Sequence, residues 1–180
     1  MNYFIGAYWG AREESRRECA VRVAVFLGIL AKENIGLSQW YKKSRSLKTS
    51  LVPIPNDVAG LELLLKTNRR DIGGEVIAEL GFSFSVWTGP DAKAVGSLGG
   101  TCGAYNPVIS NAVVVSFEPS SSLTMEFLQE ILRAAVSAFD PEDAVVNSSE
   151  RLSKYSMPVT EAPAIYRYKR GSGFSQSEML

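Results

Sequence analysis

The chain has 180 residues, of which 46% are hydrophobic and 21% charged, close to the averages for soluble globular proteins. Its 19 basic residues balance 19 acidic ones, so bulk charge favours neither nucleic acid nor a membrane as partner. There is no histidine, which excludes Ser-His-Asp and Cys-His hydrolases and most zinc sites.

The first predicted elements are a strand and a long helix. Residues 3–9 carry large side chains on both faces, as a central strand does. A helix is expected over residues 13–32, and its second half is apolar all round, so another element should cover it. Its core-facing stripe is expected to hold Cys19, Val23, Phe26, Leu27 and Leu30.

The middle of the chain is less regular. Residues 36–56 suggest a short helix around Trp40 followed by a loop, because prolines interrupt the segment. Asp57 is a plausible N-cap for a helix that reaches Lys66. Residues 75–80 fit helix and strand equally well.

The strands that follow are more clearly patterned. Residues 82–87 alternate between large and small side chains, and a turn at residues 89–91 should lead to a return strand over 93–98. The glycine-rich stretch 96–103 lacks the lysine of a P-loop and suggests a sharply bent loop. A further strand is predicted at 113–117.

The last elements are a capped helix and two closing strands. Thr124 should cap a helix that runs to Phe139, and Asp140 with the proline after it should end it. Strands are expected at 144–146 and 165–168. This order predicts an α+β fold, a single domain with a largely antiparallel sheet packed against two main helices plus shorter helices.

The two cysteines and the apolar runs bear on localisation. Cys19 and Cys102 are expected to be reduced thiols, with Cys19 a small core residue of the first helix. The start of the chain lacks a basic signal-peptide region, and the longest apolar run, residues 23–31, is too short to span a bilayer. The sequence therefore predicts a cytoplasmic protein.

One catalytic alternative is a metal-dependent nuclease. Asp91 and Lys93 match half of a restriction-endonuclease motif, but a magnesium site needs a second, upstream carboxylate on a neighbouring strand. Asp71 or Glu75 could supply it only if the ambiguous segment beside them folded suitably. A simple hairpin turn is the favoured interpretation. Cys102 has no histidine to activate it, so a nucleophilic role is not expected.

A second alternative is a nucleic-acid-binding module. Trp40 and Tyr41 stand beside a basic segment, residues 42–48, and aromatic and basic side chains together can bind single strands. The neutral total charge and the missing nucleic-acid motif favour a solvated face or a protein contact. Trp40 and Tyr41 are therefore candidate partner-binding residues.

Acidic residues gather in the last third of the chain. Residues 111–150 contain seven acids and one base, Arg133, which suggests a docking surface for a basic partner, although a solvated helix face would have the same composition. The densest group comprises Glu126, Glu130, Asp140, Glu142 and Asp143.

Several phrases of the sequence belong together. They are residues 2–10 (NYFIGAYWG), 40–41 (WY), 68–75 (NRRDIGGE), 80–83 (LGFS) with Trp87, 102–105 (CGAY) leading into 113–115 (VVV), and 139–141 (FDP). Taken together, they resemble the immunity protein 52 family of bacterial polymorphic-toxin systems. The resemblance extends over roughly the first 150 residues, and its most specific parts are the first phrase and the 68–83 region.

The residues themselves, which contain no catalytic constellation, predict a binding protein without catalysis, cofactor or metal. The resemblance implies a cytoplasmic protein that binds and silences a toxin encoded by a neighbouring gene. The partner toxins of this family resemble restriction-endonuclease-fold nucleases, some of them delivered by type VI secretion. Residues 1–170 would form the immunity-type domain and residues 171–180 a polar tail. Family members continue past the strand that corresponds to residues 165–168, whereas this chain ends at Leu180.

Overall fold

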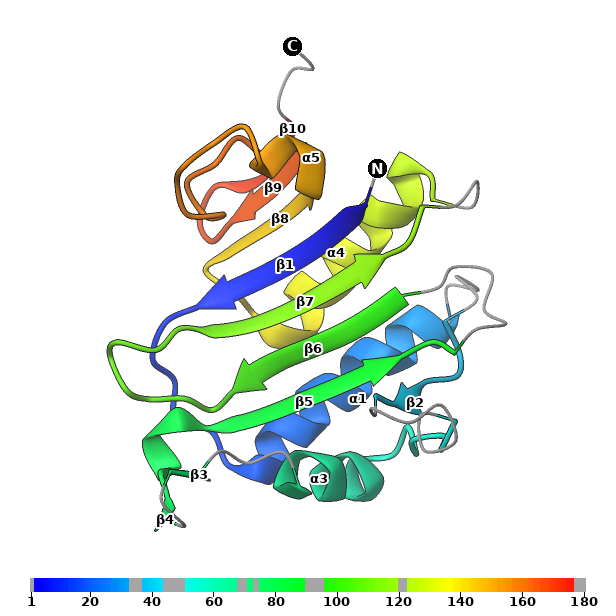
Figure 1. Ribbon diagram of the computed structural model, residues 1–180, viewed down its shortest axis with the longest axis vertical. Helices are drawn as coiled ribbons and strands as arrows, with labels where there is room; N and C mark the ends of the chain where they lie inside the picture. The colour runs from blue at the N-terminus through cyan, green and yellow to red at the C-terminus, as the bar shows by residue number, and fades with distance from the viewer. Residues whose placement is uncertain are drawn as a thin grey trace.

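An eight-stranded sheet forms the frame of the computed structural model, which describes residues 2–32, 37–43, 51–67, 71–72, 75–89, 96–119 and 123–176 (Figure 1). The strands lie in the order β10-β9-β8-β1-β7-β6-β5-β2, and every neighbouring pair is antiparallel. Their bounds are β1 (Tyr3–Trp9), β2 (Tyr41–Lys42), β5 (Phe82–Trp87), β6 (Gly96–Cys102), β7 (Asn111–Phe117), β8 (Asp143–Ser148), β9 (Tyr166–Lys169) and β10 (Gly173–Gln176). The α+β fold with a largely antiparallel sheet is therefore confirmed.

The other described elements are a small ribbon and the helices. The ribbon pairs β3 (Asp71–Ile72) with β4 (Glu75–Val76). The helices are α1 (Arg16–Lys32), α3 (Val58–Thr67), the 3-10 turn η1 (Ala78–Leu80), α4 (Met125–Phe139) and α5 (Ser149–Leu152). Residues 75–80, which fit both helix and strand in sequence, thus divide between β4 and η1.

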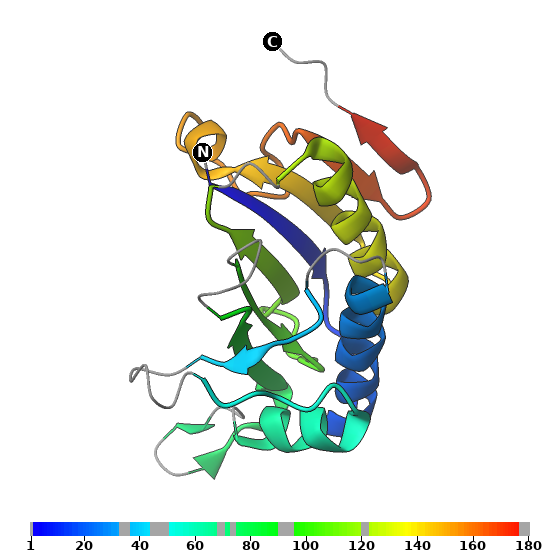
Figure 2. The same cartoon turned by 90° about the vertical axis from the view of Figure 1, so that its right-hand side faces the viewer.

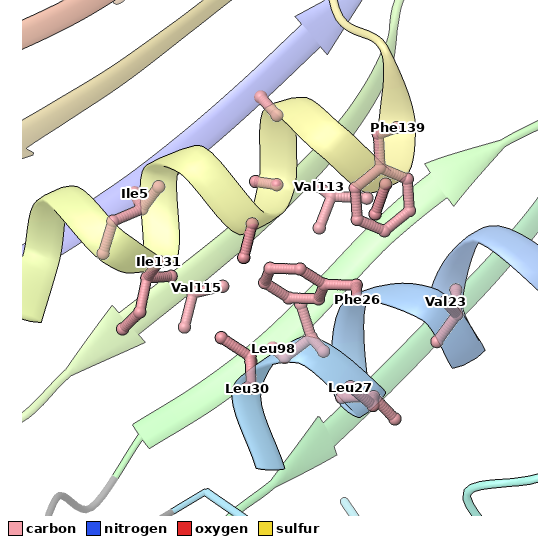
Figure 3. Packing of buried hydrophobic residues seen from close by; sticks show 14 of the residues in the cluster. Ile5, Val23, Phe26, Leu27, Leu30, Leu98, Val113, Val115, Ile131 and Phe139 are labelled. Atoms are coloured by element: carbon pink, nitrogen blue, oxygen red, sulfur yellow. The ribbon is translucent and has the colours of Figure 1, made fainter. Parts of the chain in front are cut away.

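The two long helices, α1 and α4, lie on the same face of the sheet (Figure 2). Between them and the strands lies the hydrophobic core, where Phe26 of α1 meets Phe139 of α4 with ring centroids 5.4 Å apart (Figure 3). The whole predicted stripe of α1 is buried. Burial of such large apolar side chains is the main term that holds the helices on the sheet.

The other face of the sheet is turned away from α1 and α4, and we call it the outer face. Because side chains alternate along a strand, Ile5 and Val115 point to the helices while Phe4 and Ser116 point outward. Small side chains are frequent there. The outer-face residues of β5, β6, β7 and β1 are Ser83, Ser85, Trp87, Ser97, Gly99, Thr101, Ala112, Val114, Ser116, Phe4, Gly6 and Tyr8.

The loop between α5 and β9 covers the outer face over β8 and β9. Asn147 Nδ2 donates to the carbonyl of Pro163 (3.2 Å), and Arg167 Nη2 donates to that of Ala162 (2.9 Å). These bonds explain why Asn147, a polar outer-face residue, is fully buried.

Capping residues set the helix ends. α1 begins at Arg16, three residues later than predicted, because Ser15 and Glu18 form a capping box. The amide N of Glu18 donates to the Ser15 hydroxyl (3.2 Å), and the amide N of Ser15 donates to the Glu18 carboxylate (2.7 Å). Thr124 caps α4 as predicted, and Asp140 ends it in the left-handed conformation, with φ 47°.

Arginine side chains bind the carboxyl end of α4. Arg22 Nη1 donates to the carbonyl of Ala138 (3.1 Å), and Arg12 Nη2 donates to that of Phe139 (2.7 Å). Glu14, whose side chain is 7% exposed, holds both guanidinium groups, at 3.2 Å from Arg12 Nε and 2.5 Å from Arg22 Nε. The cations satisfy carbonyls that a helix end leaves unpaired, and they complement its negative dipole.

The expected short helix around Trp40 is wrong, since the described residues 37–43 contain none. Trp40 is fully buried and its indole N–H donates to the carbonyl of Leu37 (3.0 Å). Tyr41 starts β2 because it pairs with Trp87 of β5, and the amide of Ile54 donates to the carbonyl of Trp40. Sheet pairing has overridden the local helical pattern.

The bent loop expected at residues 96–103 is also wrong. Residues 96–102 form β6, which pairs with β5 as the predicted return strand was expected to do. That strand was predicted over residues 93–98, of which 93–95 lie outside the described part of the chain. Gly100 explains the composition, because a Cβ there would collide with the carbonyl oxygen of Ala112 on β7. Glycine here permits close strand contact rather than a bend.

The predicted tail contains a strand, because Gly173–Gln176 form β10 at the edge of the sheet. Phe174 supplies the apolar contact, with its ring centroid 5.0 Å from that of Tyr168 and 6.0 Å from that of Tyr166. All four residues of β10 are exposed, so the strand has no alternating pattern by which sequence could reveal it.

Candidate partner-binding surfaces

The five predicted acids do not form one surface. Glu126 and Glu130 are exposed in the first turns of α4. Asp140 and Glu142 follow the other end of that helix, about 20 Å away at 1.5 Å per residue. The five acids are close together in the sequence, but the length of α4 separates them into two groups in the fold.

Arginines already pair with two of these acids. Asp140 Oδ2 lies 3.1 Å from Arg170 Nη2, and Asp143 Oδ1 lies 3.6 Å from Arg167 Nε. Burial raises the pKa of Asp143, and Arg167 works in the opposite direction. These carboxylates consequently offer less charge to a partner than Glu126, whose pKa is lowered by its own backbone amide and by Thr124.

The aromatic and basic candidates are placed very differently from one another. Trp40 is fully buried in the core, so it cannot contact a partner on the surface of this fold. Tyr41 is half-buried beside Trp87, and Lys42 and Lys43 are exposed. Arg45 and Lys48 of the basic segment lie outside the described residues.

The residues of the nuclease alternative are only partly described. Asp91 and Lys93 lie outside the described residues, and Glu75 is exposed in β4. Within the described ranges, no group of three or more Cys, Asp or Glu side chains could hold a metal ion.

The cysteines are buried free thiols in contact with each other. A hydrogen bond with Cys19 and burial together raise the pKa of Cys102 well above its ordinary value. A thiol needs its thiolate form to attack a substrate, so this environment opposes a nucleophilic role.

Sequence reasoning missed a hollow of about 480 Å³ on the outer face. One row of outer-face residues crosses it, in the order Trp87, Ser97, Ser116 and Phe4. Its remaining lining residues are Asn2, Tyr3, Lys43, Gly96, Phe117, Glu118 and Ser149. The signal in sequence that could have revealed it is the alternation of small outer-face residues with hydrophobic core residues along β6 and β7.

A second groove, of about 630 Å³, lies between α1 and α4 on the helix layer. Val21 and Val25 line it and remain 43% and 44% exposed, with Ser137 and Ala138 of α4 opposite. The expectation that another element covers the apolar half of α1 is therefore met only in part by the described residues.

Comparisons with known proteins agree with the resemblance in the sequence. The family model described as Immunity protein 52 matches residues 1–167, from β1 into β9. A search of curated proteins found no match. No helix in the described ranges is long and apolar enough to cross a membrane.

Proposed function

We propose, because the chain belongs to the immunity protein 52 family, that it binds a cognate toxin and neutralises it by reversible protein–protein binding. The observation that carries this proposal is the match over residues 1–167, which covers the whole of α1 and α4 and, of the ten strands that the structure describes, eight in full. An immunity protein implies a toxin as partner.

The proposal extends to the toxin. We take it to be a restriction-endonuclease-fold nuclease, encoded by a neighbouring gene and delivered into rival cells by type VI secretion. The immunity protein acts in the cytoplasm, where the nucleic acid of the cell needs protection. A nuclease must present a basic surface to its substrate, so an acidic inhibitor surface would be complementary to it.

Inhibition is proposed to occur without catalysis, cofactor or metal. The lack of histidine, the raised pKa of Cys102 and the absence of a metal-ligand group among the described residues support this. Inhibition by binding needs only complementarity of shape and charge.

Glu126 and Glu130 are the members of the predicted acidic group that best suit a docking role. Both are exposed at the start of α4 and, among the described residues, neither has an ion-pair partner. Asp140, Glu142 and Asp143 lie beyond the other end of α4, where Arg170 offsets the charge of Asp140 and Arg167 that of Asp143. Glu126 and Glu130 would therefore steer association with the toxin.

The decisive experiment combines protection with binding. Cells that express the toxin should survive when they co-express this protein, and the purified chain should bind a catalytically inactive toxin. Reversal of Glu126 and Glu130 to lysine should weaken binding at least tenfold, about 1.4 kcal/mol, largely through slower association and less so at high salt.

Three results would contradict parts of the proposal. Failure of the unaltered protein to bind or protect would remove the function itself. Cleavage of DNA or RNA with magnesium that disappears in Asp91→Ala would make the chain an enzyme. Unchanged binding by the Glu126→Lys/Glu130→Lys variant would exclude this pair as steering residues.

A further inference from the structure

We infer that the outer-face hollow receives a projecting segment of the toxin and holds an arginine or lysine side chain between the Phe4 ring and the Glu118 carboxylate. This inference rests on the proposed function, because it takes the partner to be a protein with a basic nucleic-acid-binding surface. Three properties of the hollow lead to it, namely its shape, its chemistry and the order of its charges.

The shape suits a segment of a partner. Phe4 and Trp87 stand at the two sides, and Ser97 and Ser116 form a low floor between them. β6 and β7 separate these walls, and neighbouring strands lie about 4.8 Å apart, so the walls are roughly 14 Å apart. A volume of about 480 Å³ is in the usual range of ligand-binding pockets.

The chemistry of one end suits a cation. Glu118 comes two residues after Ser116, the strand partner of Phe4, so alternation places it on the same face, and it lines the hollow together with Phe4. Glu118 is exposed and, among the described residues, has no ion-pair partner. A carboxylate beside an aromatic ring binds a guanidinium or ammonium group through both charge and the π face.

Hydroxyl and amide groups complete that end. Asn2 and Ser149 line it, and the amide of Ser149 donates to the carbonyl of Asn2 (3.0 Å), which fixes the start of α5 against the start of β1. An arginine carries five N–H donors, so acceptor oxygens around Glu118 would satisfy more of them than a carboxylate alone. The rigid strand ends hold these groups in place.

The order of charges gives the bound segment a direction. Lys43 lines the hollow at the Trp87 side, away from Glu118, and forms no ion pair with a described residue. Its ammonium group repels a cation there, so the basic side chain must point toward Phe4. A nucleic-acid strand is a poorer occupant, since Glu118 would face its phosphates.

The hollow and the α4 acids belong to the same end of the molecule. β7 ends at Phe117, just before Glu118, and α4 begins at Met125 (Figure 1). The helix-layer groove at Val21 and Val25 is on the opposite face and has no part in this contact.

The test uses the full chain and the catalytically inactive form of the toxin encoded by the adjacent gene. Ser116→Trp should fill the hollow and weaken binding at least tenfold. Glu118→Lys should do the same, mainly by slowing association, with a smaller effect at high salt. Two matched changes outside the hollow should stay within twofold of the unaltered protein, Ser137→Trp on the helix layer and Glu75→Lys in β4.

The results separate this inference from the proposed function. Thermal unfolding establishes that each variant is folded, and Glu118 is exposed, so Glu118→Lys remains informative if Ser116→Trp misfolds. Binding within twofold by Glu118→Lys, while the unaltered protein binds and protects, overturns the inference and leaves the proposed function standing. Equal weakening by Glu75→Lys would overturn it too, because the effect would then follow net charge. If the unaltered protein does not bind, the proposed function fails first.

Discussion

Glu14 should be one of the most stabilising carboxylates in the protein. Its side chain is 7% exposed and bridges Arg12 and Arg22, whose guanidinium groups bind the last carbonyls of α4. Glu14→Gln keeps the size but removes the charge, so two partly buried cations lose their counter-ion. Loss of one partner of a buried pair costs about 3–5 kcal/mol.

The expected cost must be reduced for solvent, since the side chains of Arg12 and Arg22 are 24% and 28% exposed. We therefore expect Glu14→Gln to lower the free energy of unfolding by about 2–4 kcal/mol. For a chain of this length each kcal/mol lowers Tm by about 2–4 °C. Chemical denaturation and thermal melts would measure the two quantities.

Glu13→Gln is the matched control. Glu13 precedes Glu14 and is exposed, so its neutralisation should change stability by less than about 0.5 kcal/mol. The reasoning is refuted if the two variants unfold at the same denaturant concentration. It is also refuted if Glu14→Gln is as stable as the unaltered protein at both low and high salt.

Three other predictions concern single side chains. Cys19 and Cys102 should both titrate as free thiols once the protein is denatured without reductant, and a monomer with no titratable thiol would refute this expectation. Cys19→Ala should lower the free energy of unfolding by about 1–3 kcal/mol. Gly28→Ala on α1 should stabilise the protein by up to about 1 kcal/mol, because a Cβ there meets no other atom, whereas Gly100→Ala should destabilise it, because a Cβ there collides with β7. Denaturation curves measure both effects, and a Gly100→Ala variant more stable than Gly28→Ala would contradict the prediction. The Ser15 hydroxyl lowers the pKa of Glu18, so the stabilising effect of this carboxylate is complete above pH 4.5 and is lost as the pH falls further. The Tm difference between Glu18→Gln and the unaltered protein should therefore shrink in acid, and a constant difference would exclude the capping box as its source.

Strongly patterned elements could be predicted from sequence. α4 has a cap at Thr124, an apolar stripe and a stop at Asp140, and these local signals agree with its packing on the sheet. β5 alternates between core-facing and outward-facing residues and has a strand on each side, so its sequence pattern matches its burial in the sheet. Only some of the phrases behind the family resemblance lie in such regular elements, for example in β1 and β7.

The remaining features depend on contacts between distant residues. Gly100 indicates a loop in sequence, but its real constraint is the carbonyl of Ala112 on the next strand. Trp40 resembles an exposed anchor beside lysines, yet pairing of β2 with β5 draws it into the core. The outer-face hollow unites residues from four strands and from the segments beside them, so no single stretch of sequence contains it.

The central position of β1 has a consequence for the timing of folding. Its two partners, β7 and β8, begin at Asn111 and Asp143, so the strand made first pairs with strands made late. About 100 residues separate β1 from β7, and ribosomes add about 5–20 residues per second, so a nascent chain holds β1 unpaired for roughly 5–20 s. Such long-range pairing also slows folding after release. The centre of the sheet can therefore close only after most of the chain has been synthesised, and folding must end with the pairing of its first strand.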